Sequence, residues 1–263
     1  MSTSSEGNKG VTLNMANSLW SSQICPTNTE YSHKVSKKYK AVIESVDFSD
    51  QATTDRINEW VSEKTNKMIP KLLNQNLDAS TVLVLLNAVY FKGLWEHKFD
   101  IAKTSKRVFH MSDSEKISID FMNANEKFFH RAGETKNSSY NMMKYENSNI
   151  GFVTYLPQKG HCPLKTANLE IIANMDGAPS SAKVIFSMPK FEISSQYSLT
   201  KVFKELGMKS IFTNSNDFKK IIDGDATVSD IVHAAKVKVN EKGAEAAGAT
   251  AVIMTKCLVM RNN

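Results

Sequence analysis

The residues whose types and spacing point most clearly to a function form one run near the end of the chain, from Glu241 to Arg261. Small residues dominate the first half of this run, and β-forming residues dominate the second half. Cys257 is a nucleophile by type, but no motif places a base beside it, so nucleophilic catalysis is a poor hypothesis. An exposed thiol without a role is the plain alternative. We therefore look for the chemistry of this run in its backbone conformation.

The run alternates with the two-residue period of a β-strand, although its composition alone fits a flexible Ala/Gly linker equally well. One face of the predicted strand is uncharged, and we expect that face to be buried: Ala244, Ala246, Gly248, Thr250, Val252 and Met254. The other face has a single charge that can stay in solvent: Glu245, Ala247, Ala249, Ala251, Ile253 and Thr255. The segment therefore tolerates two states, an exposed loop and a strand inserted in a sheet.

When such a segment inserts into a sheet, the free-energy cost of ordering its backbone is nearly offset by the backbone hydrogen bonds that it gains. Ordering each residue costs about 1–2 kcal/mol, and each hydrogen bond to a neighbouring strand returns roughly 0.5–1.5 kcal/mol. Burial of apolar area, at about 25 cal/mol per Å², must then decide the direction. Bulk or charge on the buried face is expected to block insertion.

The elements that would receive this strand can be predicted from periodicity. Strands are expected at 11–20, 42–48, 81–91, 107–111, 115–122, 126–132, 149–156, 183–193 and 227–240. Helices are expected at 53–69, where Thr54 caps the start and Pro70 ends the helix, and at 164–175 and 198–206. Strands outnumber helices without a regular βα alternation. The predicted class is α+β with large antiparallel or mixed sheets.

Composition narrows the classes of function. Lys and Arg number 33 against 27 Asp and Glu, a formal charge of +6 that suits a polyanion, but ordinary solvated charge is the favoured interpretation. The basic run at 33–40 lacks the interleaved aromatic residues of a nucleic-acid site and is interpreted as an exposed helix face. No membrane span is expected. The cysteines, Cys25, Cys162 and Cys257, have neither disulfide-framework nor zinc-ligand spacing, so no metal or other cofactor is expected.

Two motifs carry a family resemblance. The run VNEKGAEAAGATA, residues 239–251, closely resembles the hinge of serpins. The run LNAVYFKGLWEHKFD, residues 86–100, resembles the second serpin signature, and looser similarity extends from Val11 to Met254. The resemblance implies a serpin fold, with a large mixed central β-sheet, smaller β-sheets and surrounding helices. It also implies an inhibitor of proteases, not an enzyme, and no G-x-S-x-G, H-E-x-x-H or phosphate-cradling loop is present.

In serpins, a target protease attacks the exposed loop and is trapped as an acyl-enzyme when the cleaved loop inserts into the main sheet. By resemblance, Gly243 is the pivot, and the hinge comprises Glu241, Gly243, Ala244, Glu245, Ala246, Ala247, Gly248, Ala249 and Thr250. Counting along the loop places the scissile bond at Cys257-Leu258, with Lys256 and Arg261 as alternatives. Lys256 would suggest a trypsin-like target. The region where the sheet opens is implied to contain Asn87, Trp95 and His233.

The resemblance also shapes the expected organisation. Residues 1–10 are expected to be a disordered lead, and residues 11–263 a partial serpin domain with its reactive loop at about 241–263. Serpins have several helices before the strand expected at 11–20 and further strands after the reactive loop, so the fold is expected to be incomplete. The expected partner is a serine or cysteine protease, with neither nucleic acid nor membrane. A non-inhibitory serpin-fold binding protein, or a form without trapping activity, stays open, as do secreted and cytoplasmic locations.

Overall fold

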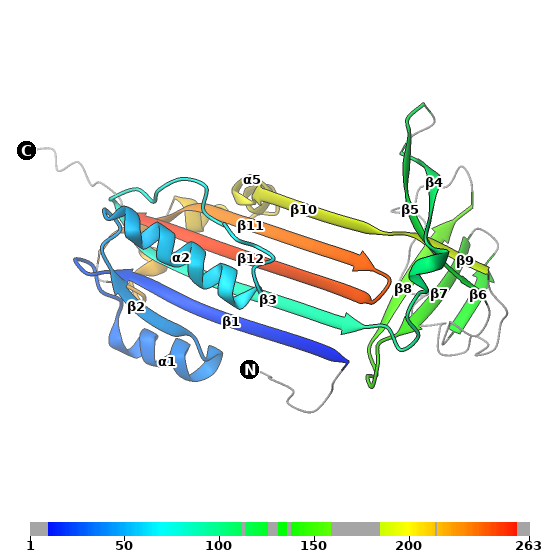
Figure 1. Cartoon of the computed structure of the whole chain (residues 1–263). Helices are drawn as coiled ribbons and strands as arrows, with labels where there is room; N and C mark the ends of the chain where they lie inside the picture. The colour runs from blue at the N-terminus through cyan, green and yellow to red at the C-terminus, as the bar shows by residue number, and fades with distance from the viewer. Residues whose placement is uncertain are drawn as a thin grey trace, which may run out of the picture.

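The computed structural model describes residues 10–111, 114–125, 131–135, 138–158, 185–213, 215–222 and 224–256. Its largest element is a six-stranded sheet with the order β10-β11-β12-β3-β1-β2 (Figure 1). The six strands are β1 (Val11–Ser22), β2 (Val42–Val46), β3 (Thr81–Leu94), β10 (Phe191–Ser198), β11 (Ala226–Asn240) and β12 (Gly243–Lys256). β1 and β2 pair in parallel, and the other pairings are antiparallel. The sheet is therefore mixed, and the α+β class is confirmed.

Two smaller sheets lie together beyond one end of the large sheet (Figure 1). One has the order β4-β5-β9 and the other β6-β7-β8. Their strands are β4 (Ser105–His110), β5 (Lys116–Asn125), β6 (Arg131–Thr135), β7 (Ser138–Lys144), β8 (Gly151–Pro157) and β9 (Ile185–Pro189). β7 was not predicted from the sequence, and the run expected as one strand at 183–193 is divided between β9 and β10. The helix expected at 164–175 lies outside the described residues.

The helix α2 (Gln51–Lys64) lies across one face of the large sheet (Figure 1). Its buried residues Ile57 and Val61 pack in one cluster with strand residues that include Val84 and Leu86. The predicted boundaries were wrong. Asp50 is the N-cap and its side chain accepts a hydrogen bond from the Ala52 amide, whereas Thr54 lies inside the helix.

The end of α2 also differs from the prediction, which placed it at Pro70. The helix ends at Lys64 with Thr65 as its C-cap, and the two residues after Thr65, Asn66 and Lys67, have positive φ angles of 51° and 62°. Left-handed residues end a helix by turning the chain out of the helical path. The apolar residues after this turn, Met68 and Ile69, join the core through a loop, which is why their helix-like spacing was misleading.

The other helical segments are short and lie at the margins. They are α1 (Thr29–Tyr39), α5 (Thr200–Glu205) and the 3-10 turns η1 (Ile101–Lys103), η3 (Ser210–Phe212) and η4 (Ser215–Phe218). α1 exposes the basic run at 33–40, as expected of a solvated helix face. Gly207 follows the C-cap of α5 with a φ of 97°, in the left-handed region that favours glycine. Within the described residues, no helix is long and apolar enough to cross a membrane.

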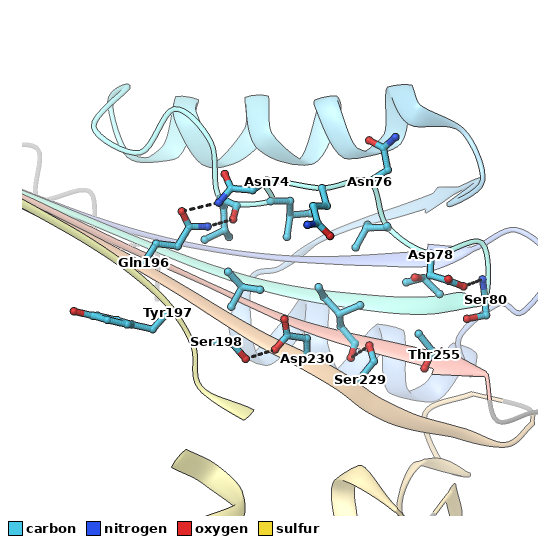
Figure 2. A pocket seen from close by; sticks show the side chains of 17 residues that line it. Asn74, Asn76, Asp78, Ser80, Gln196, Tyr197, Ser198, Ser229, Asp230 and Thr255 are labelled. Atoms are coloured by element: carbon cyan, nitrogen blue, oxygen red, sulfur yellow. Dashed lines mark hydrogen bonds between the residues drawn. The ribbon is translucent and has the colours of Figure 1, made fainter. Parts of the chain in front are cut away.

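The segment between α2 and β3 lies on the face of the sheet beneath the helix (Figure 2). The buried Asn58 of α2 holds this segment: its amide nitrogen donates to the Leu73 carbonyl at 3.0 Å, and its oxygen accepts from the Leu72 and Leu73 amides. Gln196 of β10 donates to the Leu72 carbonyl. These bonds fix the segment to α2 on one side and to β10 of the large sheet on the other.

Candidate functional site at the inserted strand

The run predicted to alternate between loop and strand is a strand in this structure. β12 lies between β11 and β3 and pairs antiparallel with both along nearly its whole length (Figure 1). In the middle of the strand, Thr250 lies opposite His233 of β11 and Asn87 of β3. The backbone of β12 therefore has hydrogen-bonding neighbours on both sides.

The face of β12 expected to stay in solvent is the one that packs beneath α2. Ala247, Ala249, Ala251 and Ile253 belong to the same buried cluster as Ile57 and Val61. The prediction that the opposite face is the buried one was therefore wrong for the middle of the strand. Sequence alternation shows that two faces differ, but it does not show which one the helix covers.

The uncharged face is buried mainly at its two ends. Ala244 packs with Trp95 and Val239, and Met254 packs with Leu19 and Leu83. Between them, Ala246, Gly248, Thr250 and Val252 are half-buried. Both faces thus hold residues that are small or apolar where burial is deepest.

Glu245 is the charged residue of the face beneath α2, and it is half-buried. The Tyr90 hydroxyl donates to its Oε1 at 2.5 Å, and the Asn66 side-chain amide lies 3.4 Å from the same oxygen. Burial, followed by the hydrogen bond to Glu245, raises the pKa of Tyr90 to about 12. Tyr90 therefore stays a hydrogen-bond donor throughout the physiological pH range, and it compensates the carboxylate that β12 brings under the helix.

Two glycines of β12 differ in whether the space around them has room for a side chain. A Cβ added to Gly243 would lie 2.0 Å from the Gly93 carbonyl oxygen of β3, so no side chain fits there. A Cβ added to Gly248 would have its nearest neighbours at 3.9 and 4.0 Å, an ordinary contact. The pivot expected from the resemblance is thus a point of close backbone approach, whereas Gly248 is not required by space.

Glu241 lies just before β12 and is 6% exposed. Its carboxylate accepts from Thr104 at 3.0 Å and forms an ion pair with Lys190 at 3.1 Å. Burial alone would raise its pKa, but its own backbone amide, Lys190 and Thr104 together outweigh burial and lower the pKa below the ordinary value of 4.5. The start of the hinge is therefore held by a charged side chain with its hydrogen bonds satisfied.

Asn87 and His233, both implied by the resemblance to lie where the sheet opens, are on strands that β12 separates in this structure. The Asn87 amide donates to Asn17 of β1 at 3.0 Å. The His233 Nδ1 lies 2.8 Å from the Thr250 hydroxyl. Each of the two therefore bonds to a different strand, and Thr250 of β12 lies opposite both of them.

Trp95 lies at the end of β3 beside the turn that connects β11 and β12. It is 1% exposed, and its ring stacks on Tyr145 with centroids 5.0 Å apart. Its indole nitrogen donates to the Asn240 carbonyl at 2.9 Å, and its backbone amide donates to the Lys242 carbonyl at 3.0 Å. Trp95 thus fixes the turn from which β12 begins.

The candidate scissile residues Cys257 and Leu258, and the alternative Arg261, lie outside the described residues, whereas Lys256 is the last residue of β12. Lys256 is therefore at the far end of β12 from Trp95, which lies beside the start of the strand. A cleft of about 770 Å³ lies near this end, and Asp78, Ser80, Asp230 and Thr255 are among its lining residues (Figure 2). None of the predicted hinge residues lines it.

Several residues that contact the hinge were missed from the sequence. Tyr90, Asn66, Thr104 and Lys190 supply the partners of Glu245 and Glu241. Each lies at least 50 residues away in the chain, as the separations of 51 for Lys190 and 155 for Tyr90 illustrate. Contacts between residues so far apart in the chain produce no periodic pattern in a single sequence, so the sequence could not predict them.

The six-stranded mixed sheet, with β12 between β3 and β11, defines a protein of the serpin fold class. The family model described as Serpin (serine protease inhibitor) matches residues 1–263. Iris from Ixodes ricinus is 34% identical over 264 residues, which is 94% of this chain and 68% of that protein. The chain thus belongs to the serpin family.

Solved structures agree with this assignment. The structure titled "Cleaved Serpin 42Da" has a TM-score of 0.84 and 29% identity, and the match covers 93% of this chain and 68% of that one. Thyroxine-binding globulin complexed with thyroxine-fluorescein has a TM-score of 0.86 at 24% identity, over 95% of this chain and 75% of that one, and shows the fold alone. The chain spans about two thirds of the length of the first curated relatives that it matches.

Proposed function

We propose that this chain supplies the sheet and reactive loop of a suicide inhibitor of a serine or cysteine protease. The single observation that carries the proposal is the fit of β12 between β3 and β11, with backbone partners on both sides. The hinge residues act as the inserting strand, and the bond at Cys257-Leu258, or one next to Lys256 or Arg261, is the bond attacked. Insertion after cleavage would carry the acylated protease from one end of the sheet to the other.

The small residues of the hinge support this proposal through packing. Ala244 is 5% exposed and shares a cluster with Trp95, Phe99 and Val239. A long charged side chain at this position would have to be buried without a partner, which costs several kcal/mol. Ala244→Arg should therefore delay insertion, so that the protease deacylates and the inhibitor becomes a substrate.

The test incubates the protein with trypsin, chymotrypsin and papain and resolves the products under denaturing conditions. The expected result is a detergent-resistant covalent complex with at least one of them. With that protease, the Ala244→Arg variant should give only cleaved chain. Lys242→Arg is the matched control, because Lys242 is exposed in the turn before β12 and keeps its charge. A Lys242→Arg variant that also failed to trap the protease would contradict the packing argument.

The second candidate is a non-inhibitory serpin-fold binding protein, a class favoured where a loop cannot insert. Thermal unfolding before and after cleavage separates the two candidates, because a loop that is exposed until it is cut and then inserts gains the contacts that β12 makes with β3 and β11 in this structure. Cleavage of the unmodified protein without a covalent complex and without a rise in Tm would overturn the inhibitor proposal.

A further inference from the structure

Glu245 is the first residue of β12 with a side chain on the face beneath α2. The strand is joined to β11 by the turn of Glu241 and Lys242, and Gly243, the first residue of the strand, has no side chain. Because the strand is tethered at this turn, the residues nearest to the turn reach the sheet with the least loss of chain entropy. A loop that inserts from this end therefore brings in Glu245, the one charged residue between Gly243 and Thr255, at an early stage.

Two polar side chains meet the Glu245 carboxylate where it enters. The Tyr90 hydroxyl donates to the Glu245 Oε1 at 2.5 Å, the length of a hydrogen bond to a charged acceptor. The Asn66 side-chain amide donates to the Tyr90 hydroxyl oxygen at 3.1 Å and lies 3.4 Å from the same carboxylate oxygen. Tyr90 and Asn66 together form what we call the carboxylate receptor.

The carboxylate receptor is held by elements other than β12. Tyr90 is 4% exposed and lies on β3, opposite Asn14 of the neighbouring β1. Asn66 lies in the turn after α2 with a φ of 51°. That turn is closed by the Lys67 amide, which donates to the Ser62 carbonyl at 2.6 Å. The position of the receptor therefore does not depend on the inserted strand.

The receptor offsets the cost of taking a charge beneath the helix. Glu245 is half-buried in the inserted strand, and loss of hydration opposes the entry of an ionised group unless protein donors replace the water. Burial, followed by the hydrogen bond to Glu245, raises the pKa of Tyr90 to about 12, so its hydroxyl keeps the proton that it donates. The next residues of this face, Ala247 and Ala249, are uncharged and need no such donor.

We propose that the Tyr90 hydroxyl, supported by Asn66, receives the Glu245 carboxylate early in loop insertion and thereby sets the balance between trapping and release of the protease. The inference rests on the proposed function. Tyr90 is a positioning residue in this process, because it acts through Glu245 and not on the scissile bond.

The balance depends on a competition that begins once the loop is cut. Insertion of the loop traps the acyl-enzyme. In the competing reaction, water hydrolyses the ester or thioester between the loop carbonyl and the protease nucleophile, which gives a cleaved chain with a new carboxylate and a free protease. The ratio of cleaved chain to covalent complex therefore equals the ratio of the two rates. Slower entry of Glu245 raises this ratio.

The experiment measures this ratio under denaturing conditions with whichever of trypsin, chymotrypsin and papain forms the covalent complex with the unmodified chain. Tyr90→Phe removes the hydroxyl and keeps the ring. We expect it to raise the ratio roughly three- to tenfold, because a hydrogen bond to a charged group is lost at a partly hydrated site. Tyr39→Phe is the matched control and should leave the ratio unchanged, because Tyr39 lies on α1 and is 52% exposed.

A second background separates the proposed role from a general loss of packing. With Glu245→Ala there is no carboxylate to receive, so adding Tyr90→Phe should change the ratio by less than about twofold. A hydroxyl that served only the stability of the sheet would have the same effect in both backgrounds. Asn66→Gly removes the amide and keeps the left-handed turn, because glycine adopts positive φ readily. It should raise the ratio less than Tyr90→Phe does, and it tests the receptor if the tyrosine variant fails to fold.

A ratio unchanged by Tyr90→Phe, with the covalent complex still formed, would overturn the inference and leave the proposed function standing. An equal rise with and without Glu245 would also overturn it, because the effect would then come from packing within the sheet. If the unmodified chain forms no covalent complex with any of the three proteases, the proposed function fails and this inference fails with it.

Discussion

The indole nitrogen of Trp95 lies 2.9 Å from the carbonyl oxygen of Asn240, so the residue that follows β3 and the last residue of β11 are joined by a part-buried hydrogen bond. The same side chain stacks on Tyr145 and packs in the cluster that contains Ala244. One tryptophan thus connects three elements at the place where the inserted strand starts.

Trp95→Phe should destabilise this junction. The substitution removes the hydrogen bond to Asn240 and part of the stack on Tyr145, and it leaves the half-buried Asn240 carbonyl without this donor. We expect a loss of about 2–3 kcal/mol in the free energy of unfolding, measured by urea denaturation. A change below about 0.5 kcal/mol would show that the turn is held by other contacts. The exposed Tyr39, substituted by Phe, is the matched control and should have little effect.

Gly243→Ala and Gly248→Ala should have opposite effects on the inserted state. A Cβ at Gly243 collides with the Gly93 carbonyl, whereas one at Gly248 meets only ordinary contacts. Alanine at 248 also reduces the entropy of the unfolded chain, so a gain of about 0.4–1 kcal/mol is expected there. Comparison of Tm for the two variants measures the difference. Equal destabilisation by both would contradict the geometry described for β12.

Glu241→Gln should change the acid sensitivity of the fold. The folded state lowers the pKa of Glu241, so the ionised carboxylate stabilises the protein at pH values above the ordinary value of 4.5. That contribution is lost as the pH falls below 4.5 and through the folded pKa. We expect the variant to be less stable by about 1–2 kcal/mol near neutral pH and to approach the unmodified protein in acid. Denaturation at a series of pH values checks this, and a difference that is independent of pH would contradict it.

Thr250→Val tests the bond between the middle of β12 and β11. Valine keeps the shape of threonine but removes the hydroxyl that lies 2.8 Å from the His233 Nδ1. Because both side chains are half-buried and water can replace part of the bond, we expect a modest loss of about 0.5–1.5 kcal/mol. Thr250→Ser is the control, since it keeps the hydroxyl. A Ser variant less stable than the Val variant would show that packing of the methyl group dominates.

The strands of the large sheet could be predicted because their signal is local. The continuous apolar run that became β3 and the alternating small residues that became β12 each give a strand signal within about ten residues. The hinge and the second signature also identified the serpin family before the fold was known. By contrast, the helix-like spacing that ran to Ile69 misplaced the end of α2, because the left-handed Asn66 and Lys67 turn the chain out of the helix.

The sequence by itself determined that the run after Asn240 can form a strand and that its two faces differ. Only the tertiary structure decided that the face bearing Glu245 lies beneath α2, and that the register sets Glu245 between Lys238 and Lys92. The physical reason is the range of the interactions. Strand period and residue size act over neighbouring residues, whereas face burial and register depend on side chains that meet only when strands distant in the chain are brought together.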